Sequence, residues 1–170
     1  MKLQISFDLI DLEKAIAIGS EVAQYADIIE VGTILIYHHG TAAIKQFKEA
    51  FPDKVILADT KIVDRGKEVV ELFAQAGADW ITVMAGTSPH VIHATTTAAH
   101  SANVKVMLDL IDSDSVGQSA QAAPDLFLVA GTSPTRLRPR PSFECGRRVF
   151  WRAFAGKPVP AVPELRAALL

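Results

Sequence analysis

The sequence is nearly free of cysteine and has no long apolar run. Cys145 is the single cysteine among 170 residues, which excludes an internal disulfide and a cysteine-based zinc site. Asp8 and Asp11 interrupt the apolar character of the N-terminus too early for a signal peptide or a membrane span. These absences predict a cytoplasmic protein that has no membrane segment.

The sequence also lacks a surplus of positive charge. Its formal net charge of −2 and the absence of any DNA- or RNA-binding pattern argue against a nucleic-acid partner. A hydrophobic content of 49% with 21% charged residues is typical of a globular domain, and a chain of this length has enough residues for a sizeable core.

Short apolar runs alternate with segments of helical period. We expect helices to begin at Asp11 and Thr41 as N-caps, to include Val69–Ala74, and to begin again at Ser88, where Pro89 follows the cap. Strands that alternate with helices in this way require a parallel sheet, so the fold class is α/β. The runs predicted as strands are Leu3–Phe7, Asp27–Val31, Val55–Ala58, Trp80–Met84, Val104–Leu110 and Leu126–Val129.

Two architectures fit this alternation, a doubly wound sheet and a (β/α)8 barrel. A doubly wound sheet usually has a glycine-rich turn after its first strand, whereas this chain has Asp8-Leu9-Ile10-Asp11 there. We therefore predict a (β/α)8 TIM barrel that is incomplete, with about six βα units.

Charged residues stand where the predicted strands end. Asp8 and the pair Asp59 and Lys61 come after apolar runs, and Glu30 and Asp109 are each the last residue but one of another run. Barrel active sites are built at the carboxyl ends of strands. Asp59 and Lys61 are two apart and share one strand face. The alternatives are helix caps and a surface salt bridge. The carboxylates beside a lysine also predict a magnesium site.

The histidines give a weaker metal signal. His90 and His93 are one helical turn apart, which is a spacing that metal ligands use. Without a third ligand nearby, a solvated helix face is the favoured interpretation.

Four motifs carry a resemblance to a known family. Leu3–Asp8, Asp27–Thr33, Ala58–Asp64 and Ala76–Val83 resemble the 3-hexulose-6-phosphate synthase and 3-keto-L-gulonate-6-phosphate decarboxylase family, within the orotidine monophosphate decarboxylase group of barrels. The resemblance runs in register from Met1 to about Leu128.

The resemblance implies roles for the charged residues. Glu30 and Asp59 would hold magnesium and, with it, the ene-diolate oxygens of a sugar phosphate. Lys61 would stand beside the same oxygens as a cationic donor, and Asp8 would hold Lys61 in place. Asp64 would reach into the site of a second subunit, since these enzymes resemble one another in being homodimers with shared active sites.

The two activities of the family differ in what joins or leaves the substrate. Leu108–Ile111, in which Asp109 would contact the substrate, resembles the synthase, which adds formaldehyde to ribulose 5-phosphate. Ile34-Leu35 and Asp79–Val83 resemble the decarboxylase. We expect the synthase, with the decarboxylase as the alternative and an inactive dimerising scaffold as a third hypothesis.

The C-terminal part departs from the family pattern. We divide the chain into a partial barrel, residues 1–134, and an Arg- and Pro-rich tail, residues 135–170. The tail is interpreted as a degenerate seventh unit or as a disordered segment. The alternative is a docking segment for an anionic partner or a membrane surface. No strand is expected from Thr135 to Arg152. Val129-Ala130-Gly131 replaces the histidine that the family has after its sixth strand, and the glycine-rich phosphate loops are not evident. A reading-frame disturbance after Val129 is our hypothesis for this difference.

Overall fold

The computed structural model describes residues 2–111, 126–128 and 149–154. The strands are β1 (Lys2–Phe7), β2 (Ile28–Val31), β3 (Val55–Ile62), β4 (Trp80–Met84), β5 (Lys105–Asp109), β6 (Leu126–Leu128) and β7 (Val149–Phe154). The helices are α1 (Leu12–Val22), the 3-10 turn η1 (Ala23–Tyr25), α2 (Thr33–His39), α3 (Thr41–Ala50), α4 (Gly66–Gln75) and α5 (Pro89–Ser101).

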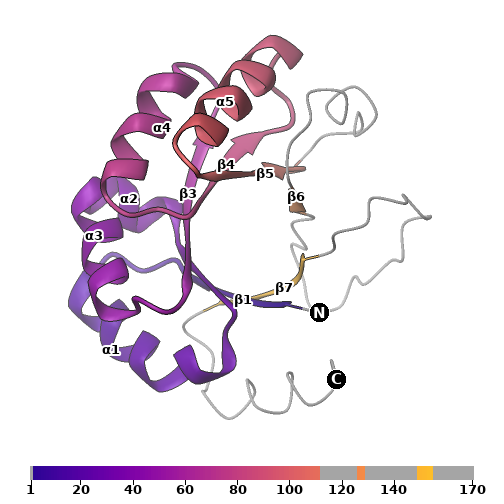
Figure 1. The fold of residues 1–170 in the computed structure, drawn as a ribbon. Helices are drawn as coiled ribbons and strands as arrows, with labels where there is room; N and C mark the ends of the chain where they lie inside the picture. Colours follow the sequence, from indigo (N-terminus) through magenta and orange to yellow (C-terminus); the bar gives the residue numbers. More distant parts are fainter. Residues whose placement is uncertain (1, 112–125, 129–148, 155–170) are drawn as a thin grey trace.

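All the strand pairs are parallel, and they form one curved sheet. The strand order is β6-β5-β4-β3-β2-β1-β7. Figure 1 shows the helices along the outer side of the curve, while the end strands β6 and β7 approach each other across the open side. This is the α/β, barrel-type architecture that the sequence predicts, with parallel strands wrapped by helices on one side.

Residue alternation along the strands separates an outer core from an inner one. Leu3, Ile5 and Phe7 of β1 are buried against the helices, where the rings of Phe7 and Phe47 lie 5.4 Å apart between centroids. On the inner side of the sheet, Ile28, Leu57, Trp80 and Met107 pack together. Because side chains alternate along a strand, the next inner positions toward the carboxyl ends are those of the charged residues.

Two of the three predicted helix caps are present. The Asp11 carboxylate accepts a hydrogen bond from Lys14 N at 3.0 Å, and Ser88 caps α5 with Pro89 as its first residue. The Thr41 prediction was wrong, because Thr41 is the first residue of α3. Gly40 ends α2 and precedes α3 with φ at +59°, so a single left-handed glycine takes the place of a side-chain cap.

The structure adds two elements and lengthens a third. α2 begins at Thr33, within a run of apolar residues that sequence periodicity left unassigned. β3 continues past Ala58 to Ile62, so Asp59 and Lys61 belong to the strand itself.

The second added element is β7, which pairs with β1 although we expected no strand between Thr135 and Arg152. Val149, Phe150 and Trp151 favour strands, but the prolines and arginines before them concealed that preference. Val129–Gly131, where the family has its histidine, and the tail other than β7 lie outside the described residues. Within the described ranges, no helix is long and apolar enough to cross a membrane.

Candidate active site at the carboxyl ends of the strands

Three fully buried carboxylates and one lysine lie on the inner side of the sheet. Glu30 of β2, Asp59 of β3 and Asp109 of β5 each have no exposed surface, and the Lys61 side chain is 26% exposed. Lys61 Nζ lies 2.8 Å from Asp109 Oδ2 and 3.0 Å from Asp59 Oδ2. The structure therefore brings together residues that are 48 positions apart in the chain.

The two aspartates determine the charge state of Lys61. Burial by itself lowers the pKa of an ammonium group, but the hydrogen bond with Asp109 and the negative charges of Asp59 and Asp109 outweigh it and raise the pKa of Lys61 above its ordinary value of 10.5. Lys61 is therefore a cation at neutral pH. It is suited to stabilising negative charge and unsuited to removing a proton.

Two threonine hydroxyls hold the Asp59 carboxylate in place. Thr33 Oγ1 donates to Asp59 Oδ2 at 2.8 Å, and Thr82 Oγ1 donates to Asp59 Oδ1 at 2.9 Å. Thr82 Oγ1 also accepts a hydrogen bond from Lys61 N at 2.9 Å. Sequence reasoning gave neither threonine a role. The available signal was a polar residue among the apolar residues of β4.

The backbone of Lys61 is strained. Its φ of +46° lies in the left-handed region, where long side chains are uncommon. The register between β3 and β4 shifts between Ala58 and Ile62, on either side of this residue. Such conformations cost about 1–3 kcal/mol and persist where the surrounding structure enforces them. Thr82 and the two ion pairs provide that enforcement.

Glu30 is held from the neighbouring strand β1. Gln4, which is also buried, donates a hydrogen bond from Nε2 to Glu30 Oε2. Ser6 is the residue opposite Glu30 in the register of β1 and β2, so Gln4 lies one inner layer below Glu30. Gln4 was not among the residues singled out from the sequence.

Asp8 and Asp64 lie closer to the rim than the buried cluster. Ser6 Oγ donates to Asp8 Oδ2 at 2.9 Å. Lys61 forms ion pairs with Asp59 and Asp109, and the role of Asp8 in holding Lys61 stays a prediction. Asp64 is exposed and accepts a hydrogen bond from Arg65 N at 2.7 Å. Its role in a second subunit stays a prediction.

The donor set fits a hard divalent cation. Three buried carboxyl groups and one ammonium lie in this part of the interior, where a divalent cation would add a counter-charge. Carboxylate oxygens are the ligands that magnesium prefers, and it completes its shell with water and substrate. Among residues 2–111, 126–128 and 149–154, no three carboxylate, imidazole or thiolate groups converge on one point, so water and substrate would have to supply the remaining ligands.

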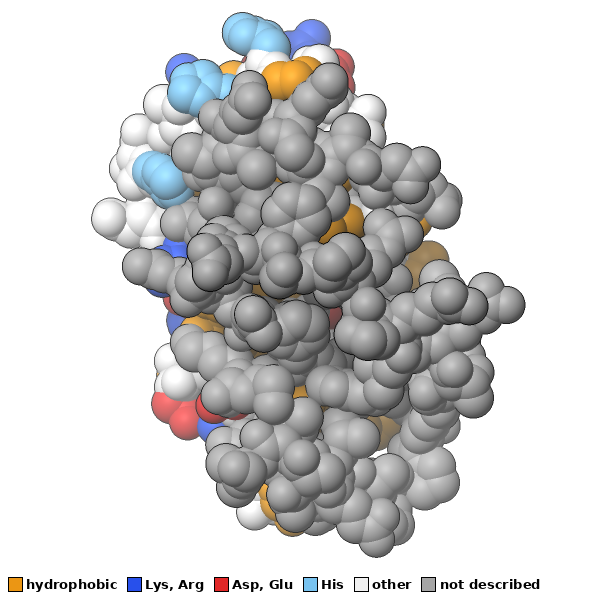
Figure 2. Space-filling view, turned by 90° about the vertical axis from the view of Figure 1, so that its right-hand side faces the viewer, with side chains coloured by type: hydrophobic (Ala, Val, Ile, Leu, Met, Phe, Trp, Pro, Cys, Tyr) orange, Lys and Arg blue, Asp and Glu red, His pale blue; other side chains and the backbone are white. Residues whose placement is uncertain are grey.

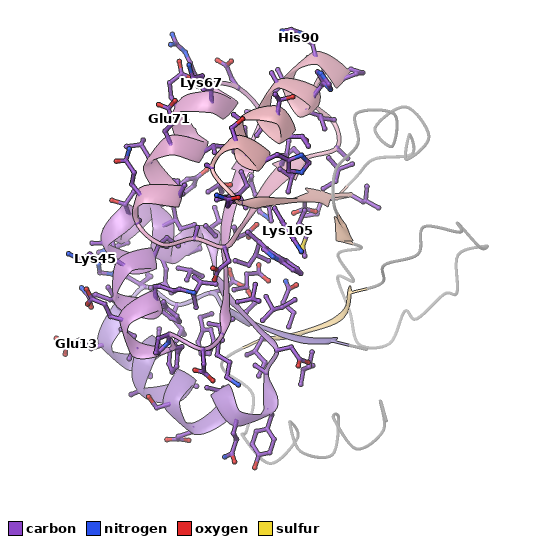
Figure 3. All side chains as sticks on the ribbon, viewed as in Figure 1. Glu13, Lys45, Lys67, Glu71, His90 and Lys105 are labelled. Carbon is purple, nitrogen blue, oxygen red and sulfur yellow. The ribbon has the colours of Figure 1, made fainter. Side chains whose placement is uncertain are left out.

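The histidines of α5 do not contribute to this site. His90, His93 and His100 are exposed, and Figure 2 shows pale-blue histidine side chains at the upper end of the molecule, where Figure 3 places His90. The solvated helix face is the interpretation that these positions support.

The amino ends of the strands form the floor of the barrel. In Figure 3, Lys105 lies on the inner side of the sheet, whereas Glu13, Lys45, Lys67 and Glu71 point away from it on the outer helices. Lys105 Nζ is 5.9 Å from the centroid of the Trp80 ring. The buried carboxylates therefore stand above an apolar and aromatic floor.

Comparison with known proteins identifies relatives for the part of the chain that carries this site. Residues 1–134 match the family model described as Orotidine 5'-phosphate decarboxylase / HUMPS family. The 3-hexulose-6-phosphate synthase of Mycobacterium gastri is 39% identical over 121 residues, which is 71% of this chain and 58% of that protein. Its counterpart from Bacillus subtilis (strain 168) is 38% identical over 112 residues, 66% of this chain and 53% of the relative.

Solved structures agree with the sequence comparison. The 3-hexulose-6-phosphate synthase from Salmonella typhimurium superposes with a TM-score of 0.73 at 36% identity, over 78% of this chain and 65% of that chain. The 3-keto-L-gulonate-6-phosphate decarboxylase from Vibrio cholerae gives a TM-score of 0.62 at 35% identity, over 64% and 50% of the two chains. This chain spans little more than half the length of the curated relatives that it matches.

Proposed function

The chain belongs to the orotidine 5'-phosphate decarboxylase / HUMPS family, and from this premise we propose that it is a magnesium-dependent carbon–carbon lyase that acts on a sugar phosphate through an ene-diolate. The observation that carries the proposal is the buried cluster of Glu30, Asp59, Lys61 and Asp109. Buried charge of this density is costly for stability, and the cost is explained by a reaction that develops charge on oxygen.

Lys61 is the electrostatic centre of the proposed reaction. Its ammonium stays protonated between Asp59 and Asp109, and it would donate a hydrogen bond to an ene-diolate oxygen as negative charge develops there. The Asp109 carboxylate, which holds Lys61, would also face the substrate. Asp8, on the loop after β1, would contribute from the rim.

Glu30 and Asp59 are the residues that would hold magnesium. The cation would supply Lewis-acid stabilisation of the substrate oxygens. Thr33 and Thr82 occupy both Asp59 oxygens with hydrogen bonds. These bonds fix the plane of the carboxylate and so limit the positions at which a cation would bind.

We assign synthase chemistry first, because both curated relatives described above are 3-hexulose-6-phosphate synthases. In that reaction ribulose 5-phosphate loses a proton to give the ene-diolate, whose carbon forms a bond to formaldehyde. The alternative is loss of carbon dioxide from 3-keto-L-gulonate 6-phosphate, which produces the same kind of ene-diolate. The similarity to the Vibrio cholerae decarboxylase supports testing both reactions.

We further propose that the chain works as a homodimer, with Asp64 entering the site of the partner. Four large apolar side chains are exposed where β1, β2 and β3 end, namely Ile10, Ile34, Tyr37 and Val63. His39 Nε2 lies 2.7 Å from Ile10 O, which joins α2 to the loop after β1. An apolar rim of this kind on the segments around the site is suited to a second copy.

The assay that tests the assignment supplies ribulose 5-phosphate, formaldehyde and magnesium to the full chain and follows formaldehyde. Consumption supports the synthase. Release of carbon dioxide from 3-keto-L-gulonate 6-phosphate without formaldehyde consumption would transfer the assignment to the decarboxylase. A folded protein that catalyses neither reaction would leave the scaffold hypothesis as the better account.

A further inference from the structure

Gln4 is a polar residue on the inner face of β1, beside the apolar inner cluster of the described strands. Its side chain is on the inner face of β1 and only 1% of the residue is exposed. Ile28 stands directly opposite it on β2, and Ile28 belongs to the inner cluster with Leu57, Trp80 and Met107. A hydrophobic residue would suit this environment better than a primary amide.

The amide of Gln4 is only half satisfied. Its Nε2 donates to Glu30 Oε2, while Oε1 is the single buried side-chain polar atom among the described residues that has no hydrogen-bond partner. Leaving a buried acceptor without a donor is unfavourable. Since the fold tolerates this cost in its core, the bond from Nε2 to Glu30 is the feature that explains the choice of glutamine.

We propose that Gln4 is a positioning residue for Glu30, and this inference rests on the proposed function of Glu30 as a magnesium ligand. By holding Oε2 from below, Gln4 fixes the rotation of the carboxylate about its terminal bond. A long, flexible glutamate side chain needs such a partner to present its oxygens in one orientation. Outer partners of this kind commonly change metal affinity by 10–100-fold when they are removed.

The test compares magnesium affinity and stability in the full chain. Gln4→Met keeps the length of the side chain, removes the unpaired acceptor and suits the apolar floor. We expect calorimetric titration with magnesium alone to show an affinity at least about tenfold weaker than that of the wild type, with a melting temperature that changes little. A structural role alone would lower the melting temperature and leave magnesium affinity unchanged.

A matched control and a double-mutant cycle locate the effect. Thr96→Val removes another buried polar group, on α5, whose hydroxyl donates to Ile92 O at 2.8 Å, and it should leave magnesium affinity unchanged. In a Glu30→Gln background, Gln4→Met should weaken magnesium binding by much less than it does in the wild type, because Gln4 acts through Glu30.

A measurement on the unsubstituted chain covers the case in which Gln4→Met does not fold. In NMR spectra, the resonance of the Gln4 side-chain amide should shift when magnesium is added. The same Gln4 resonance should shift equally in the Thr96→Val variant. Unchanged affinity in Gln4→Met, or an amide resonance that is indifferent to bound magnesium, would overturn the inference while the proposed function stands. If magnesium does not bind the wild-type chain at all, the proposed function and this inference fail together.

Discussion

At the scale of single residues, the site depends on the groups that surround Asp59 and Lys61 as much as on those two residues. Asp59 accepts hydrogen bonds from two threonines and forms an ion pair with Lys61. Lys61 keeps a left-handed backbone that its own side chain disfavours. Substitutions at the supporting positions should therefore affect catalysis without touching a group that would contact the substrate.

Thr82 offers the sharpest test of this support, because one hydroxyl serves both Asp59 and the Lys61 backbone. Thr82→Val keeps the shape and removes the hydroxyl, and we expect lyase activity to fall about 10–100-fold with a loss of about 1–3 kcal/mol in the free energy of unfolding. Thr82→Ser keeps the hydroxyl and should retain most of the activity. Equal activity in the two variants, measured by initial rates, would contradict the positioning role.

Lys61 should stabilise the fold in a pH-dependent way. Removing the ammonium by Lys61→Met leaves Asp59 and Asp109 buried without the cation that they contact. In the absence of metal, the free energy of unfolding of this variant should be about 3 kcal/mol lower than that of the wild type at neutral pH. The raised pKa of Lys61 means that the folded state favours the proton. This stabilisation is fully present below pH 10.5 and is lost as the pH rises through the raised value.

Urea unfolding of both proteins in the presence of a chelator measures this difference. The difference in the free energy of unfolding between the wild type and Lys61→Met should be constant through neutral pH and should become smaller above pH 10.5. A gap that narrows already between pH 7 and pH 9 would mean that Lys61 is not held by its two aspartates.

At the scale of elements, the close approach of the loop after β1 to the start of α2 places Asp8 at the rim. A Cβ on Gly32 would lie 2.3 Å from Asp8 Oδ1 and 2.7 Å from Phe7 O. Both distances are too short for any side chain at this position. Glycine is therefore required here for space, since its φ of −65° is open to any residue.

Gly32→Ala should displace Asp8 and the end of β1. We expect a loss of lyase activity of about tenfold or more, because misplacement of about 1 Å near a reacting centre is sufficient for such an effect. Gly86→Ala is the matched control, because a Cβ there meets nothing within 4 Å in the loop after β4. Initial rates for the two variants that differ by less than twofold would contradict this account.

Most of the strands could be predicted from the sequence. Apolar runs predicted the first six strands, because a strand buried on both faces needs no polar alternation. The same criterion predicted that the third strand ends at Ala58, because Asp59 and Lys61 interrupt the apolar run. In the structure, β3 continues through both residues. Charges inside a strand are visible in a sequence, but the partners that make them tolerable there are not.

Partners from distant segments explain the remaining omissions. Thr33, Thr82 and Gln4 have ordinary residue types for their elements, and their roles follow from the positions of Asp59 and Glu30 in space. The strand at Val149–Phe154 is likewise specified by pairing with β1, which is distant in the sequence. The register of the four family motifs, by contrast, was sufficient to indicate Glu30, Asp59 and Lys61.

At the scale of the whole molecule, the exposed apolar rim predicts an association state. Tyr37 is 78% exposed on α2, beside the loop that carries Ile10. If this rim joins two copies, Tyr37→Glu should shift the protein from dimer to monomer, because an ionised carboxylate would be buried without a partner. Leu72→Glu changes an apolar residue on α4 that is 57% exposed, and it should leave the dimer intact.

Light scattering coupled to size exclusion distinguishes these outcomes. A wild-type protein that is monomeric at micromolar concentration, or a Tyr37→Glu variant that remains dimeric, would contradict the proposed interface. The dimer also bears on catalysis, because Asp64 would act in the partner's site. Tyr37→Glu should therefore reduce activity although Tyr37 is not assigned to the reaction.

We propose that the buried cluster of Glu30, Asp59, Lys61 and Asp109 is a working lyase site. Its most direct test is formaldehyde consumption by the full chain with ribulose 5-phosphate, measured with magnesium, after chelation and after magnesium is restored. We expect formaldehyde consumption that stops on chelation, returns with magnesium and is lost in Lys61→Met. Consumption that continues at an equal rate in the chelator or in Lys61→Met, or no consumption by folded wild-type protein, would contradict it.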